Sequence, residues 1–271
     1  MKKFIKILLG TVLAVSVFLY WQDNDIVVTK YEYKSEKVPE GFEGFKIAQV
    51  SDLQNKMFFK NQSSLIKNLK KTDADIIVIT GDLVDANRTN IDNAYTFIDK
   101  AVKIAPVYYV SGNHENASGV YEELLEGLKI RGVNILENTY EYIDRNGDKI
   151  AIMGMKDIRM NYDFDKVIED MSNKNEGYFK ILLSHRPELY SVYDEKGVDL
   201  SFTGHAHGGQ IRLPFTDGLF APNQGAFPKY TSGLRYFDNS AMVISRGLGN
   251  SVFPFRIFNR PEITVTTLYS E

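Results

Sequence analysis

The stretch DIIVITGDLVD (residues 75–85) decides the fold of this 271-residue chain. Residues 75–80 form a continuous apolar run rich in β-branched residues, which is typical of a strand buried on both faces of a sheet. Gly81 then permits a sharp turn, and Asp82 and Asp85 follow where the strand ends. This order predicts a strand that delivers two carboxylates to one edge of an α/β sheet.

The same kind of apolar run recurs along the chain. The matching runs are FKIAQV (45–50), VYYVS (107–111), KIAIMGM (149–155), KILLSH (180–185), DLSFTGH (199–205), AMVIS (241–245) and EITVTTL (262–268). Apolar stripes at helical spacing separate the early strands, within residues 65–69, 94–101 and 119–130. Strands that alternate with helices, followed by a strand-rich end, predict an α/β domain with sheet packed on sheet and helices outside.

Composition excludes several kinds of protein. Hydrophobic residues make up 44% and charged residues 25% of the chain, which is ordinary for a folded domain. The net charge of −3 argues against specific nucleic-acid binding, because that function needs a basic face. The absence of cysteine excludes disulfides, Cys-ligated metals and thiol nucleophiles. We therefore expect one monomeric domain whose metal ligands, if any, are His, Asp, Asn, Glu or Gln.

The first residues predict a membrane anchor. Lys2, Lys3 and Lys6 precede an apolar run from Ile7 to Trp21, as in secretory signals and signal anchors. No small-x-small cleavage site follows the run, which favours a retained single-pass anchor in the cell membrane over cleavage and secretion. The lysines predict that the N-terminus lies in the cytoplasm and the rest of the chain outside.

Three segments follow from this organisation. Residues 1–22 are expected to form the signal anchor or transmembrane helix, and residues 23–44 a first strand and a connector. The strand is predicted from IVVTKYEYKS (26–35), which alternates β-branched and aromatic residues. Residues 45–271 are expected to form the catalytic domain.

Side chains that can bind metal follow five of the predicted strands. They are Asp52 and Gln54, Asp82 and Asp85, Asn113 and His114, His185, and His205 and His207. The chain has four histidines, and all four lie in these clusters. Because strand ends of an α/β sheet converge on one crevice, we expect one metal site.

The ligand types narrow the metal. Imidazole, carboxylate and amide groups without thiolate suit Mn²⁺, Fe, Co²⁺, Ni²⁺ or Zn²⁺. These groups are too numerous for one ion, so the sequence predicts two divalent ions bridged by a carboxylate, between which a water is activated.

The ordered motifs SDLQ (51–54), GDLVD (81–85), GNHE (112–115), SH (184–185) and GHAH (204–207) resemble those of the calcineurin-like metallophosphoesterases. The resemblance covers roughly residues 45–268, and its C-terminal motifs resemble the bacterial membrane-anchored or exported branch. It implies a four-layer α/β/β/α sandwich. It also implies hydrolysis of phosphate mono- or diesters or pyrophosphates, on small-molecule, lipid-linked or cell-envelope substrates.

The resemblance also implies residue roles. Asp82 would bridge the ions, Asp52, Gln54 and His207 would hold the first ion, and Asn113, His185 and His205 the second. His114, oriented by Asp85, would stabilise the transition state or protonate the leaving oxygen. Glu115 belongs to the motif but receives no direct role.

Gln54 departs from the family pattern, which usually has His at this position. A neutral amide oxygen is a weaker and harder ligand than imidazole, so we expect a loosely held first ion and a preference for Mn²⁺. The departure also supports an alternative function, a non-catalytic relative that binds a phosphorylated ligand. A metallohydrolase acting on a non-phosphate bond is a further alternative.

Three arginines have open roles. Arg88 and Arg246 are candidates for binding substrate phosphate by bidentate contacts, with a structural role as the equal alternative. Arg186, directly after His185 and before Pro187, is expected to face solvent.

Residues 211–236 are rich in Phe, Leu, Gly and Pro. They suit either an apolar rim for a lipid-linked substrate or a long loop that packs Phe215, Phe220 and Phe227 against the core. We favour the second interpretation, and the same one for the apolar residues 57–59.

Overall fold

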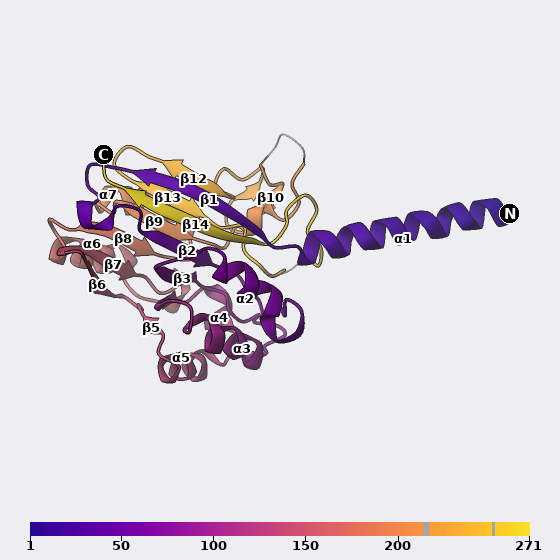
Figure 1. The fold of residues 1–271 in the computed structure, drawn as a ribbon, viewed down its shortest axis with the longest axis horizontal. Helices are drawn as coiled ribbons and strands as arrows, with labels where there is room; N and C mark the ends of the chain where they lie inside the picture. Colours follow the sequence, from indigo (N-terminus) through magenta and orange to yellow (C-terminus); the bar gives the residue numbers. More distant parts are fainter. Residues whose placement is uncertain (214–216, 251–252) are drawn as a thin grey trace.

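The computed structural model of the chain describes residues 1–213, 217–250 and 253–271. Figure 1 shows a body of stacked sheets and helices from which one long helix, α1 (Lys2–Asn24), projects. Among the described residues, α1 is the helix long and apolar enough to cross a membrane.

Two six-stranded sheets form the centre of the described structure. The first has the order β1 (Val27–Lys34), β14 (Glu262–Tyr269), β2 (Lys46–Val50), β3 (Ile76–Thr80), β4 (Val107–Val110), β5 (Asn134–Ile135). The second has the order β12 (Gly233–Tyr236), β13 (Ala241–Ile244), β9 (Leu200–Thr203), β8 (Phe179–Leu183), β7 (Asp148–Gly154), β6 (Thr139–Arg145). Strands β2 to β5 are mutually parallel, as are β7, β8, β9 and β13.

Helices cover the outer face of each sheet. On the first sheet these are α2 (Ser63–Lys70), α3 (Ile91–Ala101) and α5 (Tyr121–Ile130). On the second they are α6 (Phe164–Lys174) and α7 (Tyr190–Glu195). The short α4 (Asn113–Ala117) lies in a connection. So do the 3₁₀ turns of the described residues, at Glu40–Phe42, Lys60–Gln62, Ile158–Met160, Pro187–Leu189 and His207–Gly209.

Strand β3 shows how the layers arise from the sequence. Its side chains alternate between the two faces of the sheet. Ile77 and Ile79 pack with the helices, whereas Ile76 and Val78 pack between the two sheets. A third buried cluster fills the space between the second sheet and its helices. Three apolar interiors separate four layers, and the predicted α/β/β/α sandwich is confirmed.

The segment after the helix belongs to a sheet. Strand β1 pairs in parallel with β14, Val27 opposite Glu262, and forms the edge of the first sheet. Gln22, near the end of α1, is buried. The C-terminal end of α1 is therefore held against the body.

In the Phe-rich segment of residues 211–236, the described phenylalanines do not pack on the core as expected. Phe220 and Phe227 are 54% and 79% exposed, so the prediction that they pack on the core is wrong, and Phe215 lies outside the described residues. The hairpin of β10 (Phe220–Ala221) and β11 (Gly225–Ala226) is held by backbone pairing, which leaves these rings outside. Beyond β2, Phe58 is buried whereas Phe59 is 75% exposed.

Candidate metal centre

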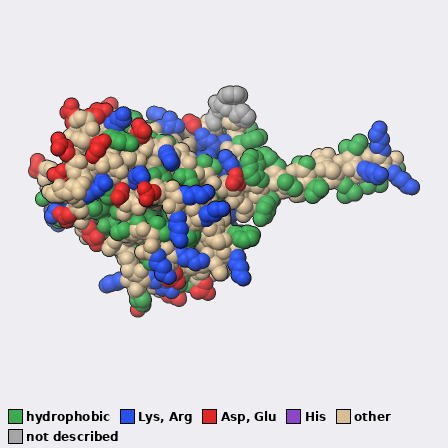
Figure 2. Space-filling model, in the orientation of Figure 1, with side chains coloured by type: hydrophobic (Ala, Val, Ile, Leu, Met, Phe, Trp, Pro, Cys, Tyr) green, Lys and Arg blue, Asp and Glu red, His purple; other side chains and the backbone are tan. Residues whose placement is uncertain are grey.

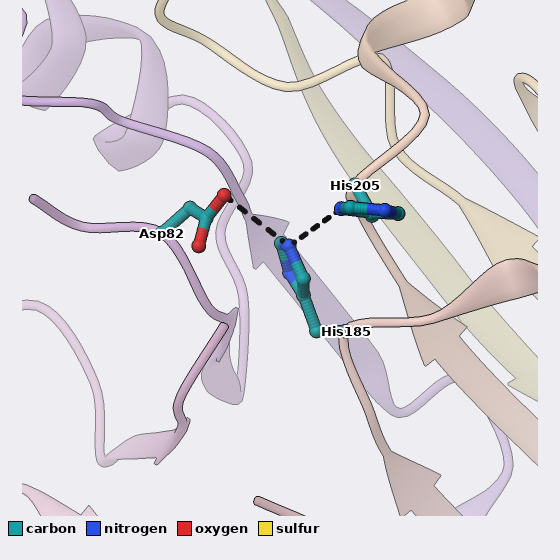
Figure 3. A group of neighbouring side chains, drawn as sticks. All are labelled: Asp82, His185 and His205. Carbon is teal, nitrogen blue, oxygen red and sulfur yellow. Dashed lines mark hydrogen bonds and ion pairs between the residues drawn. The ribbon is translucent and has the colours of Figure 1, made fainter. Parts of the chain in front are cut away.

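The carboxyl ends of β2, β3, β8 and β9 bring the predicted metal ligands together. Two buried groups have ligand atoms within 4.8 Å of one another, and they share Asp82. One group is Asp82, His185 and His205, and the other is Asp52, Asp82 and His207. Figure 3 shows the first, with both imidazoles and the carboxylate pointing toward one another.

The turns that carry these residues have unusual backbone geometry. Asp52, Gln54, Asp82, His205 and His207 all have positive φ, between 47° and 63°. Non-glycine residues in this region are uncommon, and they cluster at functional sites where the surrounding structure holds them.

Glu115 supplies part of that restraint. Its buried carboxylate accepts hydrogen bonds from the N–H groups of Asp82 at 2.8 Å, Leu83 at 2.6 Å and Gly112 at 2.8 Å. It thereby ties the loop after β3 to the loop after β4. Sequence reasoning gave Glu115 no direct role, and the structure shows it positioning the turn of Asp82.

Two positions near the site require glycine, because side chains of the site lie close to their backbone. A Cβ on Gly112 would lie 2.2 Å from Asp82 Oδ1, and one on Gly204 would lie 1.9 Å from Ser51 Oγ and 2.5 Å from Asp52 Oδ2. Any side chain there would displace a carboxylate of the site.

His185 is held so that Nε2 faces the site. Its Nδ1–H donates to the carbonyl oxygen of Thr80 at 2.7 Å, and its Nε2 lies 3.3 Å from Asp82 Oδ2 and 3.2 Å from His205 Nδ1. Burial opposes protonation, but Asp82 and Asp52 raise the pKa of His185 to about 10. Burial likewise opposes ionisation of Asp82, yet His185 and His114 hold its pKa below the ordinary value. A cation bound by Asp82 and His185 would take the place of this shared proton.

The other two imidazoles are kept neutral. Burial, His185 and Arg186 place the pKa of His205 well below its ordinary value, and burial lowers the pKa of His207. Neutral imidazole is the form that binds metal.

Arg186 is a residue that sequence reasoning placed wrongly. It is 2% exposed, because its guanidinium forms two bonds, of 2.6 and 3.1 Å, to the buried carboxylate of Asp157. Its Nη1 also lies 2.8 Å from His205 Nε2. Nothing in the sequence marks the distant Asp157 as its partner.

Within the described part of the chain, several buried polar atoms of the site have no hydrogen-bond partner. They are Gln54 Oε1, Asn113 Oδ1 and His207 Nδ1. Burying such a group unpaired costs about 1–3 kcal/mol. The amide nitrogen of Gln54 donates to Asp82 Oδ2 at 2.9 Å. These unpaired oxygen and imidazole atoms lie around the shared carboxylate of Asp82. Ligand atoms of this kind fit divalent cations.

His114 lies at the edge of this set. Its Nδ1 accepts a hydrogen bond from the N–H of Ala86 at 3.0 Å, and its Nε2 lies 3.9 Å from Asp82 Oδ2. The neutral ring thus carries its proton on Nε2, the atom nearest the site. The Asp85 carboxylate accepts from the N–H groups of Asn87 and Arg88, both at 2.9 Å. Asp85 therefore acts on His114 through the turn that contains Ala86.

A polar cleft of about 420 Å³ opens beside Gln54. It is lined by Gln54, Asn55, Lys56, Arg88, Asn90, Asn93 and Asn250. Burial and the nearby Arg256 lower the pKa of Lys56 to about 7, against the opposing effect of Asp23. Arg88 lines this cleft and forms an ion pair of 3.2 Å with Asp85, and Arg246 forms one of 2.9 Å with Glu262. Sequence reasoning missed Lys56, since a lone lysine carries no motif.

Comparisons with known proteins agree with this geometry. The family described as "Calcineurin-like phosphoesterase" matches residues 45–209. The uncharacterised metallophosphoesterase YkuE of Bacillus subtilis is 31% identical over 93% of this chain and 88% of its own length. The phosphodiesterase YaeI of Escherichia coli is 27% identical over 72% of this chain and 70% of its own. A dimetal phosphatase from Danio rerio has a similar fold, with a TM-score of 0.51, 10% identity, and coverage of 84% of this chain and 94% of that one.

Proposed function

Because the chain belongs to the calcineurin-like phosphoesterase family and is a dinuclear metal-dependent phosphohydrolase, we propose that it cleaves phosphate esters or pyrophosphates of the cell envelope or extracellular space. The observation that carries the chemistry is the pair of buried ligand groups that share Asp82. The proposed location rests on α1, with its basic N-terminal end inside the cell.

We assign the ligands to two ions that share Asp82. The first ion is assigned to Asp52, Gln54 Oε1, Asp82 and His207, and the second to Asp82, Asn113, His185 and His205. The oxygen-rich first set favours Mn²⁺ over Fe, Zn²⁺, Co²⁺ or Ni²⁺. When bound, such a pair of cations supplies Lewis acidity, which lowers the pKa of the attacking water and neutralises phosphoryl charge.

His114 is proposed to stabilise the transition state as a hydrogen-bond donor, because a neutral imidazole does not readily give up its one N–H proton. Its Nε2–H is directed at the side of the site where Asp82 lies, and the N–H of Ala86 fixes the ring. From there it can donate a hydrogen bond to a phosphoryl oxygen or to the leaving oxygen. Arg88 and Lys56, which line the polar cleft, are placed to bind an anionic part of the substrate. The ion pair with Glu262 favours a structural role for Arg246.

The test is esterase activity of the full-length protein in detergent micelles. With Mn²⁺ and chromogenic phosphate mono- and diesters, we expect turnover that His114→Ala lowers by about 10²–10⁴-fold while both metal ions are retained. Asn173→Ala, an exposed change on α6, is the control and should leave turnover unchanged. Absence of turnover in the metal-replete parent protein would contradict the proposal.

Gln54 is the one observation that favours a second candidate, a non-catalytic binder of phosphorylated ligands. That function predicts tight metal and phosphate binding without turnover in the same assay. A reporter fused after residue 271 tests the location separately. Reporter activity in the cytoplasm would refute the outward orientation.

A further inference from the structure

The C-terminal end of α1 packs on aromatic residues of the body. The ring centroids of Phe18 and Phe258 are 5.6 Å apart, and Phe59 lines a hollow together with Val17 and Trp21. Phe253 and Phe255, whose rings are 6.3 Å apart, lie in the same C-terminal segment. We name this set the aromatic collar: Phe59, Phe253, Phe255 and Phe258.

The collar is exposed in the protein alone. Its rings are 75%, 37%, 42% and 53% exposed, in the order given above. Figure 2 shows hydrophobic side chains gathered where the helix joins the body. Clustered aromatic rings on a surface mark an interaction site, whereas isolated ones do not.

The length of α1 determines what covers the collar. Residues 4–21, which are uncharged except for Lys6, span about 27 Å at about 1.5 Å per residue. This length is no more than the roughly 30 Å hydrocarbon core of a bilayer. If α1 crosses the bilayer, its whole apolar length must therefore lie within the membrane. The turn containing Val17 and Phe18 lies about 4–6 Å nearer the bilayer centre than Trp21. Collar rings that touch this turn must share its depth.

Aromatic and charged residues at the C-terminal end of α1 also suit a position at the membrane–water interface. Tyr20 and Trp21 are exposed, as expected of residues at a membrane–water interface. Arg260 stacks over the Trp21 ring at 5.2 Å and pairs with Asp25. These contacts fix how the body sits against the helix.

The polar cleft of the active site adjoins this junction. Lys56 and Asn250 line the cleft, and both donate hydrogen bonds to Asp23, at the end of α1. The N–H of Arg256 also donates to the Asp23 carboxylate, at 2.8 Å. On its other side the cleft reaches Gln54, which is bonded to Asp82. The cleft thus runs from the metal ligands to the last turn of the anchor.

We propose that the aromatic collar inserts into the bilayer interface and holds the polar cleft at headgroup level, so that the substrate is a phosphate ester carried by a membrane amphiphile. This inference rests on the proposed phosphohydrolase function and on α1 as a span. The Arg88 guanidinium in the cleft complements an anionic headgroup, and the Lys56 amine can donate a hydrogen bond to it. Presentation in the same membrane raises the effective concentration of such a substrate.

The first experiment measures depth. The chain has no cysteine, so Phe255→Cys introduces a unique site for a fluorescent label in full-length protein reconstituted in phosphatidylcholine vesicles. Ile130→Cys is the matched control, because Ile130 is 77% exposed and belongs to α5, a helix that lies far from α1 in Figure 1. We expect lipids that carry a quencher in the acyl chain to quench the label at 255 and not at 130. Equal water accessibility of the two labels would overturn the proposal.

The second experiment measures substrate preference. Proteoliposomes containing phosphatidic acid or phosphatidylglycerol are compared with soluble glycerol 3-phosphate or glycerophosphoglycerol, which carry the same phosphate without acyl chains. We expect the parent protein to favour the lipid forms by about tenfold or more. Replacing the four collar residues by Ser should remove this preference, while Ile130→Ser with Tyr236→Ser keeps it.

The outcomes separate the two proposals. Hydrolysis of the soluble esters by both variants shows that the collar changes leave the catalytic centre intact. Equal rates on lipid and soluble esters, or an unchanged preference in the collar variant, would overturn the further inference. A collar variant that instead converts a dimer to a monomer would overturn it in favour of a second copy of this chain. If no ester of either kind is hydrolysed, the proposed function fails, and the depth measurement still tests the insertion.

Discussion

The two halves of the site share one carboxylate but are built differently. In the assignment proposed above, the second-ion half is Asp82, Asn113, His185 and His205, and the first-ion half is Asp52, Gln54, Asp82 and His207. In the second half both imidazoles have fixed partners, Thr80 and Arg186. The first half has one imidazole, and its Gln54 faces the polar cleft. The difference suggests a preorganised second position and an adjustable first one.

Removing the shared ligand, Asp82, should abolish metal binding in both halves of the site. Asp82→Asn withdraws a carboxylate from both halves and leaves His185 without its closest anionic partner. We expect loss of both ions and a fall in kcat/KM of about 10³-fold or more. Metal content by elemental analysis and esterase kinetics measure the two effects. Asp170→Asn, on the exposed face of α6, is the control and should change neither. Retention of two ions in Asp82→Asn would contradict the shared-ligand assignment.

The rigidity of the second half can be tested through Arg186. Arg186→Gln removes one partner of a buried ion pair and leaves the Asp157 carboxylate uncompensated, so we expect a loss of about 3–5 kcal/mol in unfolding free energy. It should also weaken the second ion selectively, because His205 Nε2 loses one of its two partners and keeps Asn223, at 2.9 Å. Urea unfolding and metal titration of full-length protein provide the measurements.

Arg159→Gln, an exposed change nearby, should be neutral. If the Arg186→Gln variant is as stable as the parent and binds both ions normally, the pair with Asp157 is not what orders this half.

The sequence predicted the residues of the site better than the residues that hold them in position. Strand-end positions and scarce histidines singled out side chains that the structure brings together, because both signals follow from local order along the chain. The partners of Arg186 and Glu115 depend on which distant turns meet, and no local pattern encodes that contact. The fold was predictable for the same reason, because each buried strand is a continuous apolar run in the sequence. The edge strand β6 was missed, since its mixed exposure lacks a buried run.

The adjustable half should also respond to pH through Lys56. Burial lowers its folded-state pKa from 10.5 to about 7, so between these values the unfolded chain holds more protons than the folded one. Stability is therefore gained as pH rises through this window and lost as pH falls toward 7. The slope due to this group is at most about 1.4 kcal/mol per pH unit.

Lys56→Met should flatten that dependence, measured as unfolding free energy at several pH values. The exposed Lys67→Met on α2 should reproduce the slope of the parent protein. A parallel pH profile for Lys56→Met and the parent would show that the amine is not desolvated in the folded state.

The smallest expected effect is the one that would remove the difference between the halves. Gln54→His gives the first half a second imidazole, and the positive φ of residue 54 is one that His tolerates better than most residues. We expect the more weakly held ion to bind about tenfold more tightly, with a shift of preference from Mn²⁺ toward Zn²⁺, while the second ion is unaffected. Gln54→Leu is the opposite control, because it removes both the unpaired oxygen and the hydrogen bond to Asp82, and it should weaken the same ion. Metal titration resolves the two binding steps. If Gln54→His leaves the weaker step unchanged, residue 54 does not contact that ion, and the openness of the first half must come from the cleft itself.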